Sequence, residues 1–280
     1  MASGLVTISA DKTVAMSSTY SPDAVPSNIV PFGPNSNCTL DICPLEWSVY
    51  NYRPSLQANI TFLAIFAVAA AVHTFLGLKW SSWWFMSFAV FGCLVEVMGY
   101  VGRIVLYYNP FSFGGFMVQI VFITAGPVFY TASIYVTLSK TIEHLEPALS
   151  RFEPKLFYWI FITADLICLV LQGAGGALST TSSGVNTTGV DIAMAGLALQ
   201  VAALFIFTFF YVDYVARYTR SPSTPPLASR LLSFFSGLSL AIFLILGRSI
   251  YRCYELSKGY RNSDLITNED LFIGLEGVIP

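Results

Sequence analysis

Six long apolar runs dominate this sequence, and they constrain its fold more than any other feature. They cover about residues 58–78, 83–106, 115–138, 156–178, 192–212 and 231–250. A helix needs about 20 mainly apolar residues to cross the hydrocarbon core of a bilayer, and each run meets that length. A transmembrane barrel would show alternating segments of about ten residues, and these runs do not alternate. The runs therefore predict an all-α fold, a polytopic bundle of transmembrane helices.

The composition supports a membrane protein and argues against one class of partner. Of the 280 residues, 55% are hydrophobic and only 11% are charged, whereas a soluble domain carries roughly 25% charged residues. The net charge is −2 and no basic patch stands out, so we expect no nucleic-acid partner. Membrane lipids are the expected surroundings. The sequence leaves open whether the chain forms a homo-oligomer or binds a regulatory partner.

Two further segments flank the six runs. Residues 1–57 form a tail rich in Ser, Asn and Pro, without the basic start and apolar core of a signal peptide. We expect this tail to be extracytoplasmic and largely disordered to about residue 36, because it has little apolar surface to bury. Residues 58–280 form the predicted membrane domain. From about residue 271 the chain turns apolar again, which predicts the start of a truncated seventh span.

Glycosylation patterns and charges predict the orientation of the spans. Asn37 and Asn186 each begin an Asn-x-Thr sequence, and four predicted spans separate them, so both fall on one side of the membrane. The loops 139–155 and 213–230 carry Lys and Arg and are expected in the cytoplasm, although Arg248 and Arg252 count against this orientation. We expect the N-terminus outside and the protein in the plasma membrane.

Two cysteines of the tail form a candidate disulfide. Cys38 and Cys43 lie close together in the polar segment that precedes the first span. In an oxidising compartment they are able to pair, and two free thiols are the alternative. The other three cysteines lie in or beside apolar runs and are interpreted as small buried hydrophobic residues.

The sequence lacks the motifs of several enzyme classes. The only two histidines, His73 and His144, are far apart, and no cluster of histidines, cysteines or carboxylates has the spacing of a zinc site. No phosphate-binding Gly-x-x-x-x-Gly-Lys-Ser/Thr loop and no Gly-x-Ser-x-Gly elbow occurs. We therefore predict no enzymatic activity, no cofactor and no metal.

Polar residues at bilayer depth are the candidate substrate or coupling residues. A charge at a helix centre costs about 2.5–3.5 kcal/mol on insertion scales, so such groups usually face the bundle interior or an aqueous cavity. Two interpretations stay open. Either Glu96 or Asp165 pairs with Arg248 or Arg252 and holds helices in register, or the set lines a path for a lipid headgroup or a proton. The candidates are Glu96, Arg103, Gln119, Asp165, Gln172, Arg248, Arg252 and Glu255.

One stripe of the second run combines several of these features. Glu96 and Arg103 are seven residues apart and fall within about 20° of each other on a helix. Gly92 and Gly99 lie on the same face, where another backbone is able to come close. We expect this stripe to form one wall of an outward-opening polar cavity.

Five ordered motifs resemble one known family. They are the segment from Tyr50 to Asn59, the stripe from Glu96 to Arg103, the run from Gln119 to Leu138, the segment from Gln172 to Gly176, and the segment from Arg248 to Arg252. Together they resemble the fungal RTA-like family, the lipid-translocating exporters linked to aminocholesterol resistance and sphingoid-base export. The resemblance implies seven membrane helices, an outside N-terminus and an inside C-terminus. This chain departs from the family after Glu269, where the seventh span only begins.

The resemblance also implies a role in lipid movement or in resistance to lipid or drug stress. The leading hypothesis is a transporter of an amphipathic lipid, for example a sphingoid long-chain base whose cationic headgroup suits Glu96 or Asp165. One alternative is a seven-helix sensor that regulates lipid asymmetry indirectly. A second alternative is a porphyrin or drug transporter.

Overall fold

Six long helices form the membrane part of the chain. The computed structural model describes residues 29, 30, 32–145, 150, 151, 153–181, 188–220, 229–257 and 274. The helices are α1 (Leu56–Trp80), α2 (Trp83–Tyr108), α3 (Phe113–His144), α4 (Pro154–Thr181), α5 (Thr188–Arg220) and α6 (Ser229–Ser257). Each is long and apolar enough to cross a bilayer, which confirms the predicted all-α bundle. The predicted seventh span lies outside the described residues, apart from Gly274.

Most of these helices extend beyond the apolar runs that predicted them. The sequence placed Lys140 in a loop, yet α3 continues past it to His144. Likewise α6 continues to Ser257 and carries Arg252 and Glu255. Hydropathy marks only the part of a helix inside the hydrocarbon, whereas backbone hydrogen bonding continues into the polar interface. The charged residues at these ends therefore belong to rigid helices.

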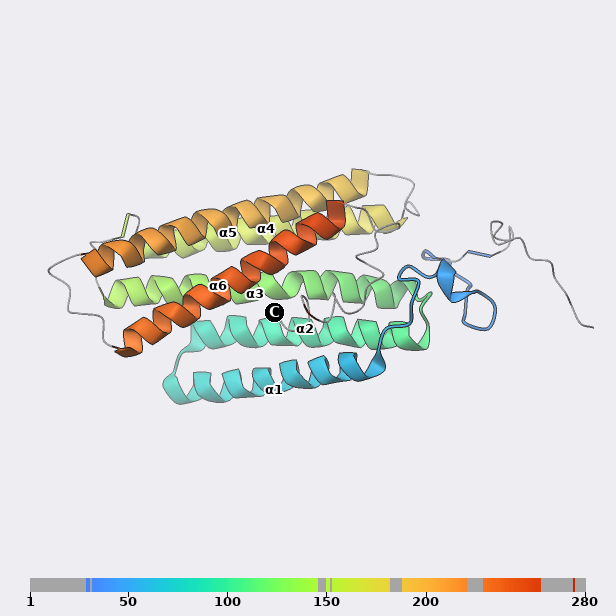
Figure 1. Ribbon diagram of the computed structural model, residues 1–280, viewed down its shortest axis with the longest axis horizontal. Helices are drawn as coiled ribbons and strands as arrows, with labels where there is room; N and C mark the ends of the chain where they lie inside the picture. The colour runs from blue at the N-terminus through green and yellow to red at the C-terminus, as the bar shows by residue number, and fades with distance from the viewer. Residues whose placement is uncertain are drawn as a thin grey trace, which may run out of the picture.

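The helices form a bundle with two different ends (Figure 1). α1 packs on α2, α2 on α3, α3 on α4 and α4 on α5, and α6 crosses α3 obliquely on one side of the bundle. The segment before α1, drawn in blue, lies where α2 ends and α3 begins. We call this the tail end. The opposite end, where α2 and α6 begin and α3 ends, is the loop end.

Glycines set the close spacing of α2 and α3. A Cβ added to Gly102 would lie 2.7 Å from the backbone nitrogen of Gln119, which leaves no room for a side chain. Gly99 similarly faces Ile123, and Gly92 faces the ring of Tyr130. Small residues allow membrane helices to approach closely and gain van der Waals contact. The α2 stripe predicted from the sequence is therefore a packing surface against α3.

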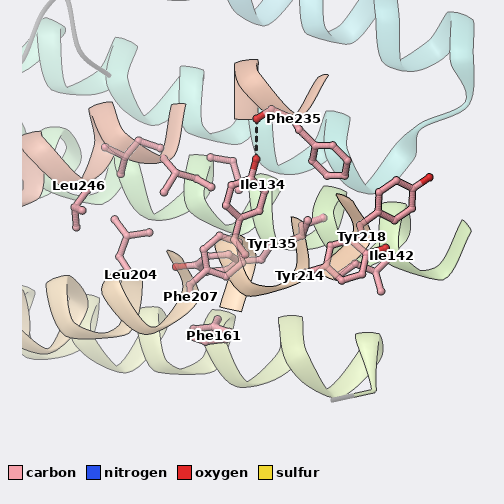
Figure 2. Packing of buried hydrophobic residues seen from close by; sticks show 14 residues of the cluster. Ile134, Tyr135, Ile142, Phe161, Leu204, Phe207, Tyr214, Tyr218, Phe235 and Leu246 are labelled. Carbon is pink, nitrogen blue, oxygen red and sulfur yellow. Dashed lines mark hydrogen bonds between the residues drawn. The ribbon is translucent and has the colours of Figure 1, made fainter. Parts of the chain in front are cut away.

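An aromatic core joins α3, α4, α5 and α6 toward the loop end (Figure 2). The ring centroid of Tyr135 lies 4.4 Å from that of Phe207 and 5.5 Å from that of Phe161. The hydroxyl of Tyr211 donates to the carbonyl of Phe235 at 2.7 Å, which ties α5 to α6. Buried tyrosines are accommodated when their hydroxyls have partners, as this one does.

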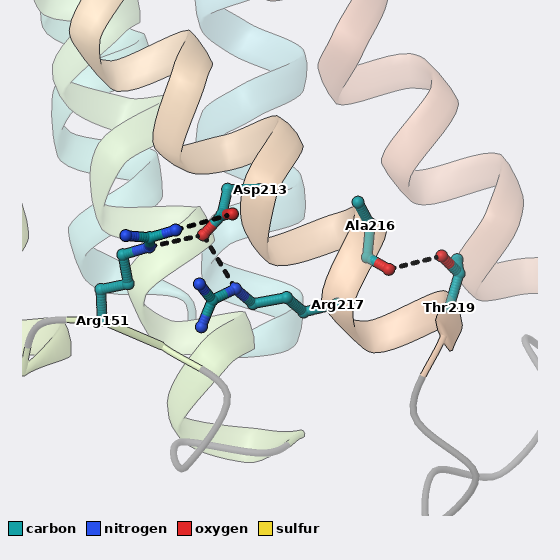
Figure 3. A network of polar contacts seen from close by, with 5 residues as sticks. All are labelled: Arg151, Asp213, Ala216, Arg217 and Thr219. Atoms are coloured by element: carbon teal, nitrogen blue, oxygen red, sulfur yellow. Dashed lines mark hydrogen bonds and ion pairs between the residues drawn. The ribbon is translucent and has the colours of Figure 1, made fainter.

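A carboxylate between two guanidinium groups marks the loop end (Figure 3). Asp213 of α5 accepts hydrogen bonds from Arg151 and Arg217, each at 3.0 Å. All three side chains are partly exposed, so solvent screens each ion pair and its contribution to stability is small. The cluster connects α5 to the segment before α4 and leaves a net positive charge at this end.

Candidate functional site

The tail segment packs onto the tail end of the bundle. Cys38 and Cys43 form a disulfide, and both pack against Phe111 in the connection between α2 and α3. Phe32 lies 5.2 Å from the ring of Phe116 between centroids. Composition alone placed Phe32 in a largely disordered region, whereas in the structure its ring packs against Phe113 and Phe116 at the start of α3.

Two tyrosines of the tail cover buried polar groups of α2 and α3. Arg103 donates from Nη2 to the hydroxyl of Tyr52 at 2.7 Å, and Gln119 donates from Nε2 to the hydroxyl of Tyr50 at 2.9 Å. Burial raises the pKa of Tyr50 well above its usual value, so its hydroxyl keeps its proton. Arg53 lies over the ring of Tyr107 at 3.9 Å and fixes the same segment. Arg103 is therefore sealed from solvent.

A proline in α3 explains the position of Arg248. Pro127 has no N–H, so the carbonyl of Ile123, four residues earlier, lacks its usual helical donor. Arg248 of α6 donates to that carbonyl from Nη2 at 3.1 Å. The same nitrogen lies 3.4 Å from Oε1 of Glu96 on α2. One guanidinium thus joins three helices and satisfies the backbone group that the proline leaves free.

This Glu96–Arg248 pair is enclosed on every side. Glu96 is 0% exposed and Arg248 is 2% exposed. A Cβ on Gly126 would collide with the carboxylate of Glu96. Of the pairings that the sequence left open, the structure contains this one. Glu96 and Arg103 line neither of the two cavities described below, and the outward-opening cavity along this stripe stays a prediction.

Asp165 is the second buried acid, and its surroundings differ from those of Glu96. Its Oδ2 lies 3.0 Å from the hydroxyls of both Thr131 and Tyr135 on α3. Its Oδ1 has no hydrogen-bond partner among the described residues, and no described cation pairs with it. Asp165 is 1% exposed. No sequence pattern singles out Thr131 and Tyr135 beyond their position shortly after Pro127.

Three candidate residues meet at a small cavity at the tail end. This tail-end cavity, about 60 Å³ in volume, lies between α3, α4, α5 and α6. Arg252 and Glu255 line it and form an ion pair of 2.9 Å, with exposures of 17% and 12%. Gln172 lines it too, donating to Gln200 at 2.7 Å while its own Oε1 has no hydrogen-bond partner in the described chain. The volume suits about one small polar group or a few water molecules.

A much larger opening lies at the loop end. This loop-end groove, about 1230 Å³ in volume, lies between the start of α2, the end of α3 and the start of α6. Its walls are mostly apolar, and Trp83 and Trp84 lie at its edge. A polar stripe of α3 faces it with Ser133, Thr137 and Thr141. The sequence did not predict this groove, because it is formed by the oblique course of α6.

The bundle and its two openings define an integral, multi-pass membrane protein. The RTA1-like protein family matches residues 89–280, and the chain belongs to that family. This confirms the family resemblance of the five motifs.

Curated relatives from yeast are similar along most of the chain. The sphingoid long-chain base transporter RSB1 of Saccharomyces cerevisiae (strain Lalvin EC1118) is 29% identical over 263 residues, covering 81% of this chain and 68% of that protein. Protein RTM1 of S. cerevisiae is 27% identical over 282 residues, covering 84% and 88%. Protein RTA1 of S. cerevisiae (strain ATCC 204508 / S288c) is 26% identical over 241 residues, covering 76% and 75%. No solved structure matches the chain.

Proposed function

We propose that this protein moves an amphipathic lipid, of the sphingoid long-chain base class, across the membrane. The observation that carries the proposal is the tail-end cavity, where Arg252, Glu255 and Gln172 converge at the depth of a membrane span. The name of the relative RSB1 supports the choice of substrate class. In this proposal the protein binds a lipid as its substrate, and transport needs no enzymatic step.

The chemistry of the tail-end cavity suits a headgroup with an ammonium and hydroxyls. The carboxylate of Glu255 is able to accept from an ammonium, and the unused Oε1 of Gln172 is able to accept from a hydroxyl or an N–H. Arg252 balances the charge of Glu255 while no headgroup is bound, so binding exchanges one cation partner for another. That exchange avoids leaving an uncompensated charge in a low-dielectric environment.

The loop-end groove suits a hydrocarbon chain. The hydroxyls of Ser133, Thr137 and Thr141 donate to carbonyls of their own helix at 2.7, 2.7 and 2.8 Å. Their hydrogens are therefore used, so these three hydroxyls offer only acceptor lone pairs to the groove. Lys140 and His144 also line the groove, near the end of α3. An apolar wall with a stripe of acceptors fits a lipid that enters with donors on its headgroup and a single chain behind them.

Lipid flux in proteoliposomes tests the proposal. Purified protein should move a labelled sphingoid base between leaflets without any other protein. Glu255→Gln should reduce that flux about tenfold or more, because a hydrogen bond to a charged group contributes about 1.5–3 kcal/mol. Glu153→Gln is the matched control, since Glu153 is exposed and directly precedes α4, whereas the tail-end cavity lies beside the second half of that helix.

The outcomes separate the proposal from its alternatives. Equal flux from Glu255→Gln and Glu153→Gln would contradict a role for the cavity. Absence of flux from the purified protein, with intact lipid-stress tolerance in cells, would favour a sensor that acts through a partner. Faster movement of a porphyrin than of the sphingoid base would favour the porphyrin-transport alternative.

We also propose that the tail end faces the outside of the cell and that the protein lies in the plasma membrane. The disulfide of Cys38 and Cys43 suits an oxidising compartment. Arg151 and Arg217 lie at the loop end, as expected of a cytoplasmic face. Asn37 is exposed and accessible for glycosylation, whereas the candidate Asn186 lies outside the described residues.

Glycosylation of Asn37 tests this orientation. Enzymatic removal of N-glycans should reduce the apparent mass of the protein from a fungal host, and Asn37→Gln should remove one glycan. Asn59→Gln is the control, because Asn59 is 2% exposed and donates to the carbonyl of Ser55, so it should carry no glycan. An unglycosylated Asn37 combined with labelling of loop-end residues from outside would contradict the orientation.

A further inference from the structure

We infer that Asp165 is a proton-binding site that couples lipid movement to the proton gradient. A buried carboxylate needs a cation or several donors to stay ionised. Asp165 has neither among the described residues. Two arginines of α6 pair with other acids: Arg248 with Glu96 and Arg252 with Glu255. Only two hydroxyls reach its Oδ2, and Oδ1 has no partner among the described residues.

The hydrogen-bond pattern accommodates a proton on the carboxyl group. The hydroxyl of Thr131 has one hydrogen and two acceptors within reach, the carbonyl of Val128 at 2.9 Å and Oδ2 of Asp165 at 3.0 Å. When Thr131 donates to Val128, a proton on Oδ2 is able to donate to the Thr131 oxygen. When the proton leaves, Thr131 turns its hydrogen to Oδ2. Protonation forms one O–H bond on Oδ2 and needs no other reactant than the proton.

Few other groups compete for that proton. Tyr135 of α3 and Cys168 of α4 are the titratable groups beside Asp165. To the core around Tyr135, α5 and α6 bring apolar side chains such as Phe207 and Ile242, together with three tyrosines of α5. These tyrosines are Tyr211, Tyr214 and Tyr218. The neutral acid fits this environment better than the carboxylate does.

Asp165 lies close to residues that line the tail-end cavity and to residues that line the loop-end groove. Leu169, one turn further along α4, and Gln172, two turns further, line the tail-end cavity. On α3, Thr131 and Tyr135 contact Asp165, while their neighbours Tyr130 and Ser133 line the loop-end groove. Asp165 thus lies between the levels of the two openings, where loss or gain of its charge changes the packing of α3 on α4.

Infrared spectroscopy tests the proton site without any transport. Protein labelled with ¹³C at the aspartate carboxyl groups should show a protonated carboxyl band at neutral pH that fades as the pH rises. Asp165→Asn should remove the band, since Asn keeps the shape of the side chain. Asp213→Asn should leave it, because Asp213 is ion-paired at the loop end. Absence of the band from the wild-type protein would overturn the proton site.

Lipid flux under a pH gradient tests the coupling, which rests on the proposed function. With one coupled proton, a gradient of one pH unit changes the rate by up to about tenfold. The wild type and Asp213→Asn should show this response, and Asp165→Asn should change by less than about twofold. A wild-type flux that ignores the gradient would overturn the coupling. A titrating infrared band without any lipid flux would instead refute the proposed substrate while supporting the proton site.

Discussion

The two ion pairs of α6 lie one helical turn apart and occupy different environments. Arg248 pairs with Glu96 and is 2% exposed, whereas Arg252 pairs with Glu255 and is 17% exposed beside a cavity. In the first pair, Arg248 also satisfies the carbonyl that Pro127 leaves free, so its guanidinium has a structural role. The second pair joins residues of one helix and borders open space. The same residue types therefore hold helices together in one place and, in our proposal, bind the lipid headgroup in the other.

Of the variants that test this comparison, the removal of Arg248 should lower the free energy of unfolding most. Arg248→Met removes a donor from both Glu96 and the Ile123 carbonyl, and loss of one partner of a buried pair costs about 3–5 kcal/mol. Unfolding by SDS in mixed micelles measures this free energy. The double variant Glu96→Gln with Arg248→Met should regain part of the loss, because no unpaired charge is then buried. A cost below about 1 kcal/mol for Arg248→Met would show that the pair is not structural.

A smaller loss of stability should follow when the hydrogen bond between Tyr52 and Arg103 at the tail end is removed. Tyr52→Phe removes the hydroxyl that accepts from Arg103 at 2.7 Å and keeps the ring beside the guanidinium. Hydrogen bonds to charged groups contribute about 1.5–3 kcal/mol, so the free energy of unfolding should fall by that amount. Tyr108→Phe is a matched control, because Tyr108 is 67% exposed. Equal stability of both variants would mean that the tail does not seal Arg103.

The smallest effect on stability should come from the cavity pair. The double variant Arg252→Gln with Glu255→Gln removes a partly exposed pair within one helix, and such pairs contribute about 1 kcal/mol or less. The same SDS titration should show an unfolding free energy close to that of the wild type. A loss as large as that of Arg248→Met would remove the distinction between the two pairs.

The sequence predicted the helices and the candidate residues better than it predicted their relationships. Apolar length is a local property, so the six spans were readable from the runs. The pairing of Glu96 with Arg248 depends on the oblique packing of α6 on α3, which no local pattern encodes. One clue was available: Pro127 frees the carbonyl of Ile123, and a buried donor from another helix is a natural partner for it.

Other parts of the site depended on contacts between distant segments. Tyr50 and Tyr52 belong to a tail whose composition suggested little structure, yet they meet Arg103 and Gln119 across more than fifty residues of sequence. The loop-end groove arises only where three helix ends diverge. Asp165 was a candidate from the sequence, but that no cation among the described residues pairs with it is visible only once the arginines of α6 have been placed.

Equilibrium binding of a sphingoid long-chain base to the purified protein tests the central distinction most directly. Glu255→Gln should weaken binding about tenfold or more, because the headgroup loses its carboxylate. The double variant Glu96→Gln with Arg248→Met, if folded, should bind within about twofold of the wild type. The opposite pattern, with binding lost in the double variant and kept in Glu255→Gln, would contradict the assignment of Glu96 and Arg248 to structure and of the tail-end cavity to the lipid.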